Sequence, residues 1–267
     1  MKEAYRHLTA AAEAKETAIG RLAEIIAILR VECPWDRVQT HESLRAGMLE
    51  EAYEVVEAID NKDLANLREE LGDVLLQVVF HAHIEEERGG FDLTDVINEE
   101  CEKMIRRHPH VFLEESENNH AKSIDKVLEK WENIKVQERG DKRVTSRMEK
   151  VPKALPALTR ANKIQKRAAE SGFDWDDISG AFDKVKEEYR EVISCCQDEN
   201  KDAARLKEEV GDLLFSVVNI SRFLGIDPED ALNYTNNKTL LTYRENSLGL
   251  RQGVGRDEFV GDGRVME

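Results

Sequence analysis

The chain has 267 residues, of which 35% are charged and only 6% are aromatic, and its formal net charge is −16 at pH 7. This acidity argues against binding to duplex nucleic acid, which requires a basic face. No stretch approaches the roughly 20 apolar residues of a membrane span, and the N-terminal segment lacks the apolar core of a signal peptide.

Apolar residues recur at helical spacing along most of the chain, and no run alternates apolar and polar residues as a β-strand would. The first half is expected to form helices at about 1–30, 47–59, 64–87, 93–106 and 123–139. Residues 33–46 are expected to form a polar connector. The second half is expected to form helices at about 156–170, 181–196 and 202–224. Gly225 suits the end of a helix, and Asp227-Pro228 suits the start of another. The sequence therefore predicts an all-α fold.

Four segments follow from this pattern. We expect a first helical domain over 1–113, a charged helical linker over 114–150, a second helical domain over 151–240 and an atypical tail over 241–267. The last 19 residues hold five of the 15 glycines, which is unlike a packed helix.

The cysteines bear on the cellular compartment. Cys33, Cys101, Cys195 and Cys196 form no CxxC pair and no disulfide framework. We expect reduced thiols and a cytoplasmic protein.

The two halves repeat one motif. Residues 50–55 read EEAYEV and residues 69–75 read EELGDVL, while residues 187–192 read EEYREV and residues 208–214 read EEVGDLL. Each half thus carries EExxEV, a turn and EExGDxL. Two such matched pairs indicate an internal duplication.

The spacing of the acids has a geometric meaning. Residues three apart share one face of a helix, and each pair of motifs is centred on the predicted turn between its two helices. An antiparallel helix pair would therefore bring four carboxylates together in each half. These are Glu51, Glu54, Glu70 and Asp73 in the first copy and Glu188, Glu191, Glu209 and Asp212 in the second. We also expect Gly72 and Gly211 to permit a close approach of the two helices.

Clustered carboxylates stay ionised only when cations compensate them. An all-oxygen set favours Mg²⁺, with Mn²⁺ as a substitute, and Mg²⁺ often shares its ligands with substrate phosphates. A nucleotide polyphosphate attacked by an activated water is then the expected substrate. Solvated acidic helix faces are the alternative interpretation. A di-iron centre is disfavoured because His81 and His83 have the wrong spacing for it.

The chain resembles the MazG family of all-α nucleoside triphosphate (NTP) pyrophosphohydrolases. The resemblance covers about 30–235 and is carried by CPWDRVQTH at 33–41, RRHPHVF at 106–112, LEKWENIK at 128–135, KIQKRA at 163–168, GFDW at 172–175 and both acidic motifs. It implies hydrolysis of NTPs and dNTPs to the monophosphate and pyrophosphate, a homodimer and broad base tolerance.

The resemblance also assigns residues. It implies that the four acids of each copy bind metal, and that catalysis belongs to Glu188, Glu191, Glu209 and Asp212. It further implies nucleotide contacts from Lys184, Glu187, Arg205, Glu208 and Lys238. Trp35 and Trp175 could stack on a base or fill the core. Beyond Lys238 the sequence departs from the family, with Thr242 where an arginine is expected. A nucleotide- and metal-binding regulatory protein with weak or no turnover is therefore the alternative function.

Overall fold

The computed structural model describes residues 2–112, 123, 127, 131, 134, 148–198 and 202–251, with side chains described up to residue 244. These residues form helices and no strand, which confirms the all-α class. The chain divides into two compact units, Met1–Ile134 and Lys135–Glu267. Most of the expected linker over 114–150, with its expected helix at 123–139, lies outside the described residues. Within the described ranges, none of the helices is both long and apolar enough to cross a bilayer.

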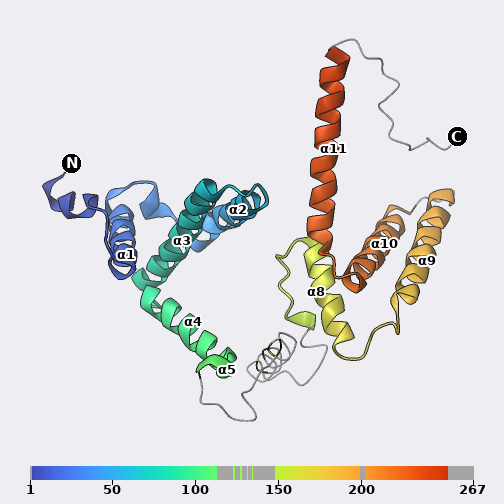
Figure 1. Ribbon diagram of the computed structural model, residues 1–267, viewed down its shortest axis with the longest axis horizontal. Coiled ribbons are helices and arrows are strands. Elements are labelled where there is room, and N and C mark those ends of the chain that lie inside the picture. The colour runs from blue at the N-terminus through green and yellow to red at the C-terminus, as the bar shows by residue number, and fades with distance from the viewer. Residues whose placement is uncertain are drawn as a thin grey trace. The chain divides into compact units, whose positions relative to one another are not determined.

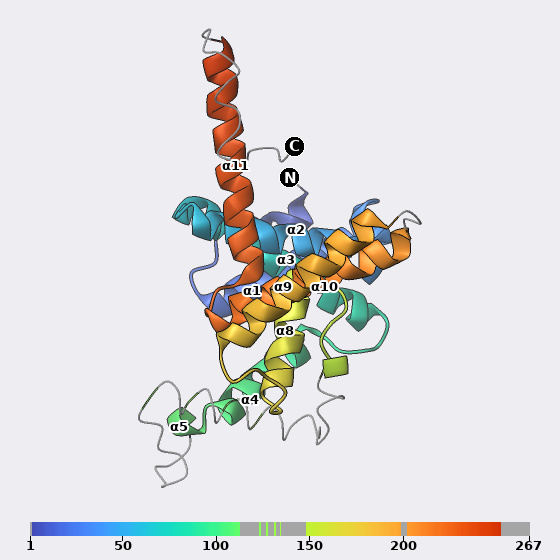
Figure 2. The same ribbon diagram turned by 90° about the vertical axis from the view of Figure 1, so that its right-hand side faces the viewer.

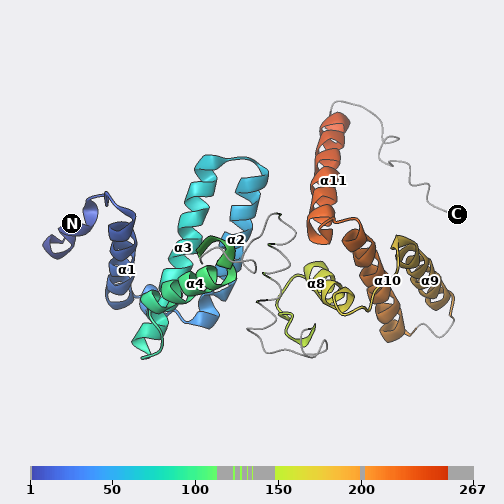
Figure 3. The same cartoon turned by 60° about the horizontal axis from the view of Figure 1, so that its bottom comes forward.

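The first unit is built on an antiparallel pair of helices, α2 and α3, joined by a short turn (Figures 1 and 3). Its elements are the 3-10 helix η1 (Glu3–Thr9), α1 (Lys15–Glu32), the 3-10 helix η2 (Asp36–Val38), α2 (His41–Asp60), α3 (Leu64–Glu87), α4 (Leu93–Arg107) and α5 (Pro109–Phe112). The helix expected over 1–30 is thus two elements, and nothing in the structure explains the break between them. The core of the unit lies between α1, α2 and α3 and contains Ile26, Leu44, Val79, Phe80 and Ile84.

Helix α2 begins six residues earlier than expected, so the connector predicted over 33–46 ends at Thr40. A capping box explains the early start: the Thr40 hydroxyl accepts from the Ser43 backbone N–H at 3.2 Å, and the Ser43 hydroxyl accepts from the Thr40 N–H at 2.9 Å. Serine stands where glutamate or glutamine usually completes this motif, which hides the signal in the sequence.

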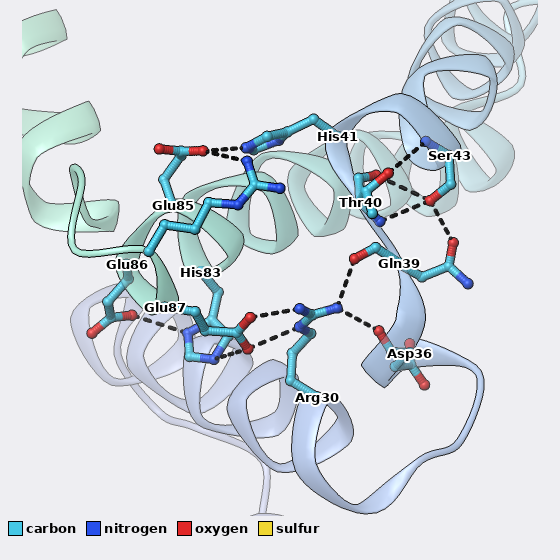
Figure 4. Close-up of polar contacts among 11 residues, drawn as sticks. Arg30, Asp36, Gln39, Thr40, His41, Ser43, His83, Glu85, Glu86 and Glu87 are labelled. Carbon is cyan, nitrogen blue, oxygen red and sulfur yellow. Dashed lines mark hydrogen bonds and ion pairs between the residues drawn. The ribbon is translucent and has the colours of Figure 1, made fainter.

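Arg30 holds the remaining connector in place (Figure 4). Its guanidinium donates to the backbone carbonyls of Asp36 at 2.6 Å and Gln39 at 2.9 Å, and it forms a two-point ion pair with Glu87 at 2.9 and 2.5 Å. The side chain of Arg30 is buried, so these contacts also satisfy its donors. The connector between α1 and α2 is therefore fixed to the end of α3.

The second unit contains α8 (Ala157–Ala169), α9 (Ile178–Gln197), α10 (Ala203–Phe223) and α11 (Pro228–Arg251). Helices α9 and α10 form the second antiparallel pair (Figures 1 and 2). Gly225, at φ +68°, follows the end of α10, and Asp227 caps α11 by accepting from the N–H groups of Glu229 and Asp230. Both predicted boundary signals are thus confirmed.

Helix α11 continues past the boundary expected at residue 240 and ends at Arg251. Residues 239–248 contain no glycine or proline, so nothing in the sequence stops the helix there. Residues 252–267 of the expected tail lie outside the described residues.

Candidate metal and nucleotide site

The turn of each helix pair sets the register of its carboxylates. In the first pair, the Asp63 carboxylate accepts from the N–H groups of Ala65 and Asn66, both at 3.1 Å. In the second, Asp202 does the same for Ala204 and Arg205 at 2.9 and 3.3 Å. These caps fix the residue at which α3 and α10 each begin. They thereby also fix which residues of α3 and α10 face the partner helix.

The first cluster comprises Glu51 on α2 with Glu70 and Asp73 on α3, whose oxygens all lie within 4.8 Å of one another. Burial raises the pKa of Glu51, and the negative charges of Asp73 and Glu54 raise it further. Burial also raises the pKa of Glu70, followed by a hydrogen bond with Glu54. The structure therefore brings three of the four predicted acids together and places Glu54 against Glu70.

The second cluster has the same arrangement. Glu188 on α9 and Glu209 and Asp212 on α10 offer oxygens within 4.8 Å of one another. Burial raises the pKa of Glu191, and a hydrogen bond with Glu209 raises it further. Burial is the main cause of the raised carboxyl pKa values in both clusters, and the neighbouring acids add to it because like charges disfavour ionisation of their neighbours.

The residues of the second cluster fit a divalent cation. Glu188 is 4% exposed, and its Oε2 has no hydrogen-bond partner among the residues that the structure describes. Leaving a buried carboxylate oxygen unpaired is costly. A hard cation held by this oxygen and those of Glu209 and Asp212 removes the cost, since all are ligands of the type such ions take.

Two cations stand at the second cluster. Lys184 Nζ lies 2.9 Å from Glu187 and 2.6 Å from Glu188, and its pKa is raised by these hydrogen bonds, that of Glu187 first. Arg205 lies 3.6 Å from Glu209. Among the described side chains, no lysine or arginine pairs with Glu51, Glu70 or Asp73. Positive charge near the carboxylates is thus a property of the second unit.

A cavity of about 530 Å³ adjoins the second cluster. Glu188, Asp212 and Lys184 form one part of its wall. The rest is mainly apolar and aromatic, with Ile164, Ala168, Phe173, Trp175 and Phe215 among the residues lining it. A concave apolar pocket that opens onto charged groups is typical of a small-molecule site.

Trp175 is held in the cavity wall by two features. A Cβ added to Gly180 would lie 2.7 Å from the Trp175 ring, so the ring packs directly on the glycine backbone. Next to it, Asp174 forms a two-point ion pair with Arg222 at 2.9 and 2.5 Å, which ties the segment before α9 to the end of α10. Trp175 is still half-exposed, so it is not a plug of the core.

The other predicted nucleotide contacts lie outside the cavity wall. Glu187, Arg205 and Glu208 are exposed on α9 and α10, and Lys238 is exposed on α11. Of the five residues implied by resemblance, the structure places only Lys184 in the cavity.

The first unit fills the space that the second leaves open. Phe80, seven residues after Asp73, is buried in the core, whereas Asn219, seven residues after Asp212, lines the cavity. Leu44, seven residues before Glu51, is also buried, and its counterpart is the smaller Ala181. Gly47 lies four residues before Glu51 in the first unit, and Lys184 lies four residues before Glu188 in the second.

The expectation for Gly72 and Gly211 is wrong. A Cβ added to either would meet nothing within 4 Å, because both face away from the partner helix. The close approach lies instead at Gly47, where a Cβ would come within 3.0 Å of the Gln77 amide nitrogen.

The polar residues of the cavity that sequence reasoning missed include Gln165, Asn219 and Arg222. It also missed a histidine contact in the first unit, where His41 Nδ1 lies 2.7 Å from His81 Nδ1 and His41 Nε2 lies 2.7 Å from Glu85 (Figure 4 shows the contact with Glu85). Amides at the buried positions of an amphipathic helix are the signal that could have identified Gln165.

Known proteins resemble this chain in both of its units. A family model described as the MazG nucleotide pyrophosphohydrolase domain matches residues 39–112 and 180–244, one segment in each unit. The chain is 48% identical over 213 residues to a Thermotoga maritima protein named nucleoside triphosphate pyrophosphohydrolase/pyrophosphatase MazG, covering 80% of this chain and 78% of that protein. It is 45% identical over 230 residues to an Escherichia coli K12 nucleoside triphosphate pyrophosphohydrolase, covering 85% and 86% respectively. A crystal structure of a MazG-related protein from Thermotoga maritima aligns with a TM-score of 0.38 and 34% identity, over 43% of this chain and 97% of that one.

Proposed function

The chain belongs to the MazG family, and from that premise we propose that it hydrolyses NTPs and dNTPs to the monophosphate and pyrophosphate with Mg²⁺ at its second repeat. The names of its relatives in Thermotoga maritima and Escherichia coli support the enzyme class. The observation that carries the choice of repeat is the cavity of the second unit, which joins Glu188 and Asp212 to an aromatic wall.

Each part of the site has a task in this reaction. Glu188, Glu191, Glu209 and Asp212 would hold Mg²⁺, or Mn²⁺ in its place. When bound, the metal supplies positive charge to the phosphates and lowers the pKa of a water. Lys184 binds phosphate oxygens from the cavity side, since its ammonium group already lies among the acids. Arg205 and Lys238 are exposed cations that would pair with the polyphosphate, and the exposed Glu187 and Glu208 are the remaining nucleotide contacts of this proposal.

The aromatic wall serves the other end of the substrate. Phe173, Trp175 and Phe215 offer flat apolar surface for a nucleobase. Stacking on such rings tolerates every base, which suits a broad substrate range.

The first repeat has a different task in this proposal. Glu51, Glu54, Glu70 and Asp73 hold metal there, but Phe80 and Leu44 occupy the space a nucleotide would need. Bound metal in that unit would stabilise the helix pair without turnover, by compensating the charges that raise the pKa values of Glu51 and Glu70.

We further propose a homodimer in the cytoplasm. Apolar side chains are exposed along both helix pairs, including Leu71 and Leu75 in the first unit and Val210, Leu214 and Val217 in the second. Such contiguous apolar faces favour association. The cysteines are unpaired throughout the described ranges, which suits a reducing compartment. Light scattering of the purified chain tests the dimer.

The decisive experiment measures pyrophosphate and monophosphate release from the eight common NTPs and dNTPs with Mg²⁺. Glu191→Gln is expected to lower turnover by roughly 100-fold or more, because it removes a metal-binding carboxylate of the second repeat. Glu54→Gln, the same change in the first repeat, is the matched control and should leave turnover nearly unchanged. Loss with Glu54→Gln alone would move catalysis to the first repeat. No release from the intact chain, with tight binding of Mg²⁺ and NTP, would leave a regulatory binding protein.

A further inference from the structure

Helix α8 contributes one buried amide to the cavity of the second unit. Gln165 is 7% exposed and lines the cavity. Its Nε2 donates to the Phe215 carbonyl oxygen at 2.7 Å, which joins α8 to α10. Because only the NH₂ end of an amide can donate to a carbonyl, the other end must be the acceptor oxygen. That oxygen, Oε1, is buried and has no hydrogen-bond partner among the residues that the structure describes.

An acceptor in this position requires a donor. The large majority of buried side-chain polar atoms in native proteins are paired with protein or with ordered water, and each exception calls for an explanation. The cavity wall includes the apolar residues Ile164 and Ala168 and the aromatic residue Trp175. A triphosphate group cannot be the partner, because ionised phosphate oxygens only accept. In the free protein a water of the cavity would supply this donor, and a donor group of a ligand in the aromatic part of the cavity would take its place.

A second amide of the cavity has its orientation fixed in the same way. Asn219 Oδ1 accepts from Arg222 Nε at 2.9 Å, and Arg222 is itself held by the Asp174 carboxylate. With its oxygen engaged, Asn219 offers its Nδ2 hydrogens as donors. The cavity therefore combines one oriented acceptor and one oriented donor.

We propose that Gln165 and Asn219 read the hydrogen-bonding edge of the nucleobase, a role that rests on the proposed function of this site. Gln165 Oε1 accepts from a base N–H, and Asn219 Nδ2 donates to the acceptor beside it. Each ordinary base carries an N–H next to an acceptor, so this pair admits all of them. A base whose edge has no N–H is selected against, because Oε1 then stays unpaired. The substrates of this site are thus NTPs whose bases retain an intact N–H edge.

Adenine provides a clean test, because its only base N–H groups belong to the 6-amino group. Purine riboside triphosphate lacks that group and is smaller than ATP, so it cannot be excluded by size. The intact chain is expected to favour ATP in kcat/KM by roughly 5- to 150-fold. Gln165→Met, which keeps the volume and removes the acceptor, is expected to bring the ratio close to one.

Gln77→Met is the matched control. Gln77 also has a buried Oε1 without a partner among the described residues, but it lies in the first unit. This variant should keep the full preference for ATP. Gln165→Glu retains an acceptor oxygen while losing the donation to Phe215, so it should keep part of the preference even if α8 packs less tightly.

Two results would overturn the inference: a ratio near one in the intact chain, or a full ratio in Gln165→Met. A full ratio with an equal loss for both substrates would show that Gln165 only joins α8 to α10. The ratio in the intact chain needs no variant, so the test survives if Gln165→Met does not fold. If no NTP is hydrolysed, the proposed function fails. Calorimetric affinities of α,β-methylene ATP and its purine riboside counterpart then test the same preference without turnover.

Discussion

The two repeats hold the same acids in different surroundings. Glu51, Glu70 and Asp73 lie as close together as Glu188, Glu209 and Asp212 do, so a helix pair with these motifs suffices to build the cluster. The substrate cavity depends on other positions. Asn219, Ala181 and Lys184 stand where the first unit has Phe80, Leu44 and Gly47. Under the proposed function, metal ligation and substrate binding are therefore separable properties of this fold, and the second unit combines them.

Filling the cavity of the second unit with a larger side chain is the strongest test of this comparison. Asn219→Phe places in the second unit the side chain that the first unit has at the corresponding position. We expect kcat/KM for ATP to fall on the order of 100-fold, because the ring occupies the space of the base. Mg²⁺ binding, measured by calorimetry, should persist. Retention of activity would show that the substrate does not enter this cavity.

The reverse change tests the first unit. Phe80→Ala removes a buried ring from the core around Ile26 and Leu44 and should destabilise that unit by about 3–5 kcal/mol. Hydrogen exchange followed by mass spectrometry should show the change in α2 and α3 and little in α9 and α10. Activity at a temperature where the protein stays folded should be unaffected. A comparable loss of activity would mean that the first unit takes part in turnover.

A smaller effect is expected at Gly180. A Cβ there would lie 2.7 Å from the Trp175 ring, so Gly180→Ala must displace the ring from the cavity wall. We expect KM for ATP to rise by about 10-fold and stability to fall by about 1–3 kcal/mol. Gly72→Ala is the control: nothing lies within 4 Å, and alanine should stabilise α3 by about 0.5–1 kcal/mol. An unchanged KM in Gly180→Ala would show that Trp175 does not contact the substrate.

The smallest effect concerns pH. Burial, followed by the charge of His41, lowers the pKa of His81 below its ordinary value of 6.5. A depressed pKa gives stability that is present above pH 6.5 and is lost as the pH falls through the folded-state value. The protection factors of the α3 amides, which correct for the slower intrinsic exchange at lower pH, should therefore fall on acidification from pH 7, and less so in His81→Gln. The carboxylates contribute equally to the pH dependence of the intact chain and of His81→Gln, so their effect cancels when the two proteins are compared. The second unit has Ile220 at this position and provides an internal reference. An equal fall of the protection factors in both proteins would contradict the assignment to His81.

Much of this architecture could be predicted because it is local. Helical periodicity identified α3, α9 and α10, and acids mirrored about a turn identified both clusters without knowledge of the packing. The errors concern contacts that the periodicity of a single helix does not predict. Gly72 and Gly211 looked like packing glycines, but the close approaches are at Gly47 and Gly180, where the neighbours are Gln77 and Trp175. Gln165 and Asn219 likewise gain meaning only when α8 meets α10, which no spacing along one helix reveals.

The turns of the two helix pairs differ in length. Glu54 and Glu70 are 16 residues apart, whereas Glu191 and Glu209 are 18 apart, yet both pairs of acids are in contact. The longer turn of the second pair therefore does not separate its acids. A single inserted residue between Glu188 and the turn would instead rotate the carboxylates by about 100° around the helix axis. Natural variation in chain length should accordingly collect at the tips of these hairpins, and the tips are also the places where a label or a foreign loop can be inserted while both clusters are preserved.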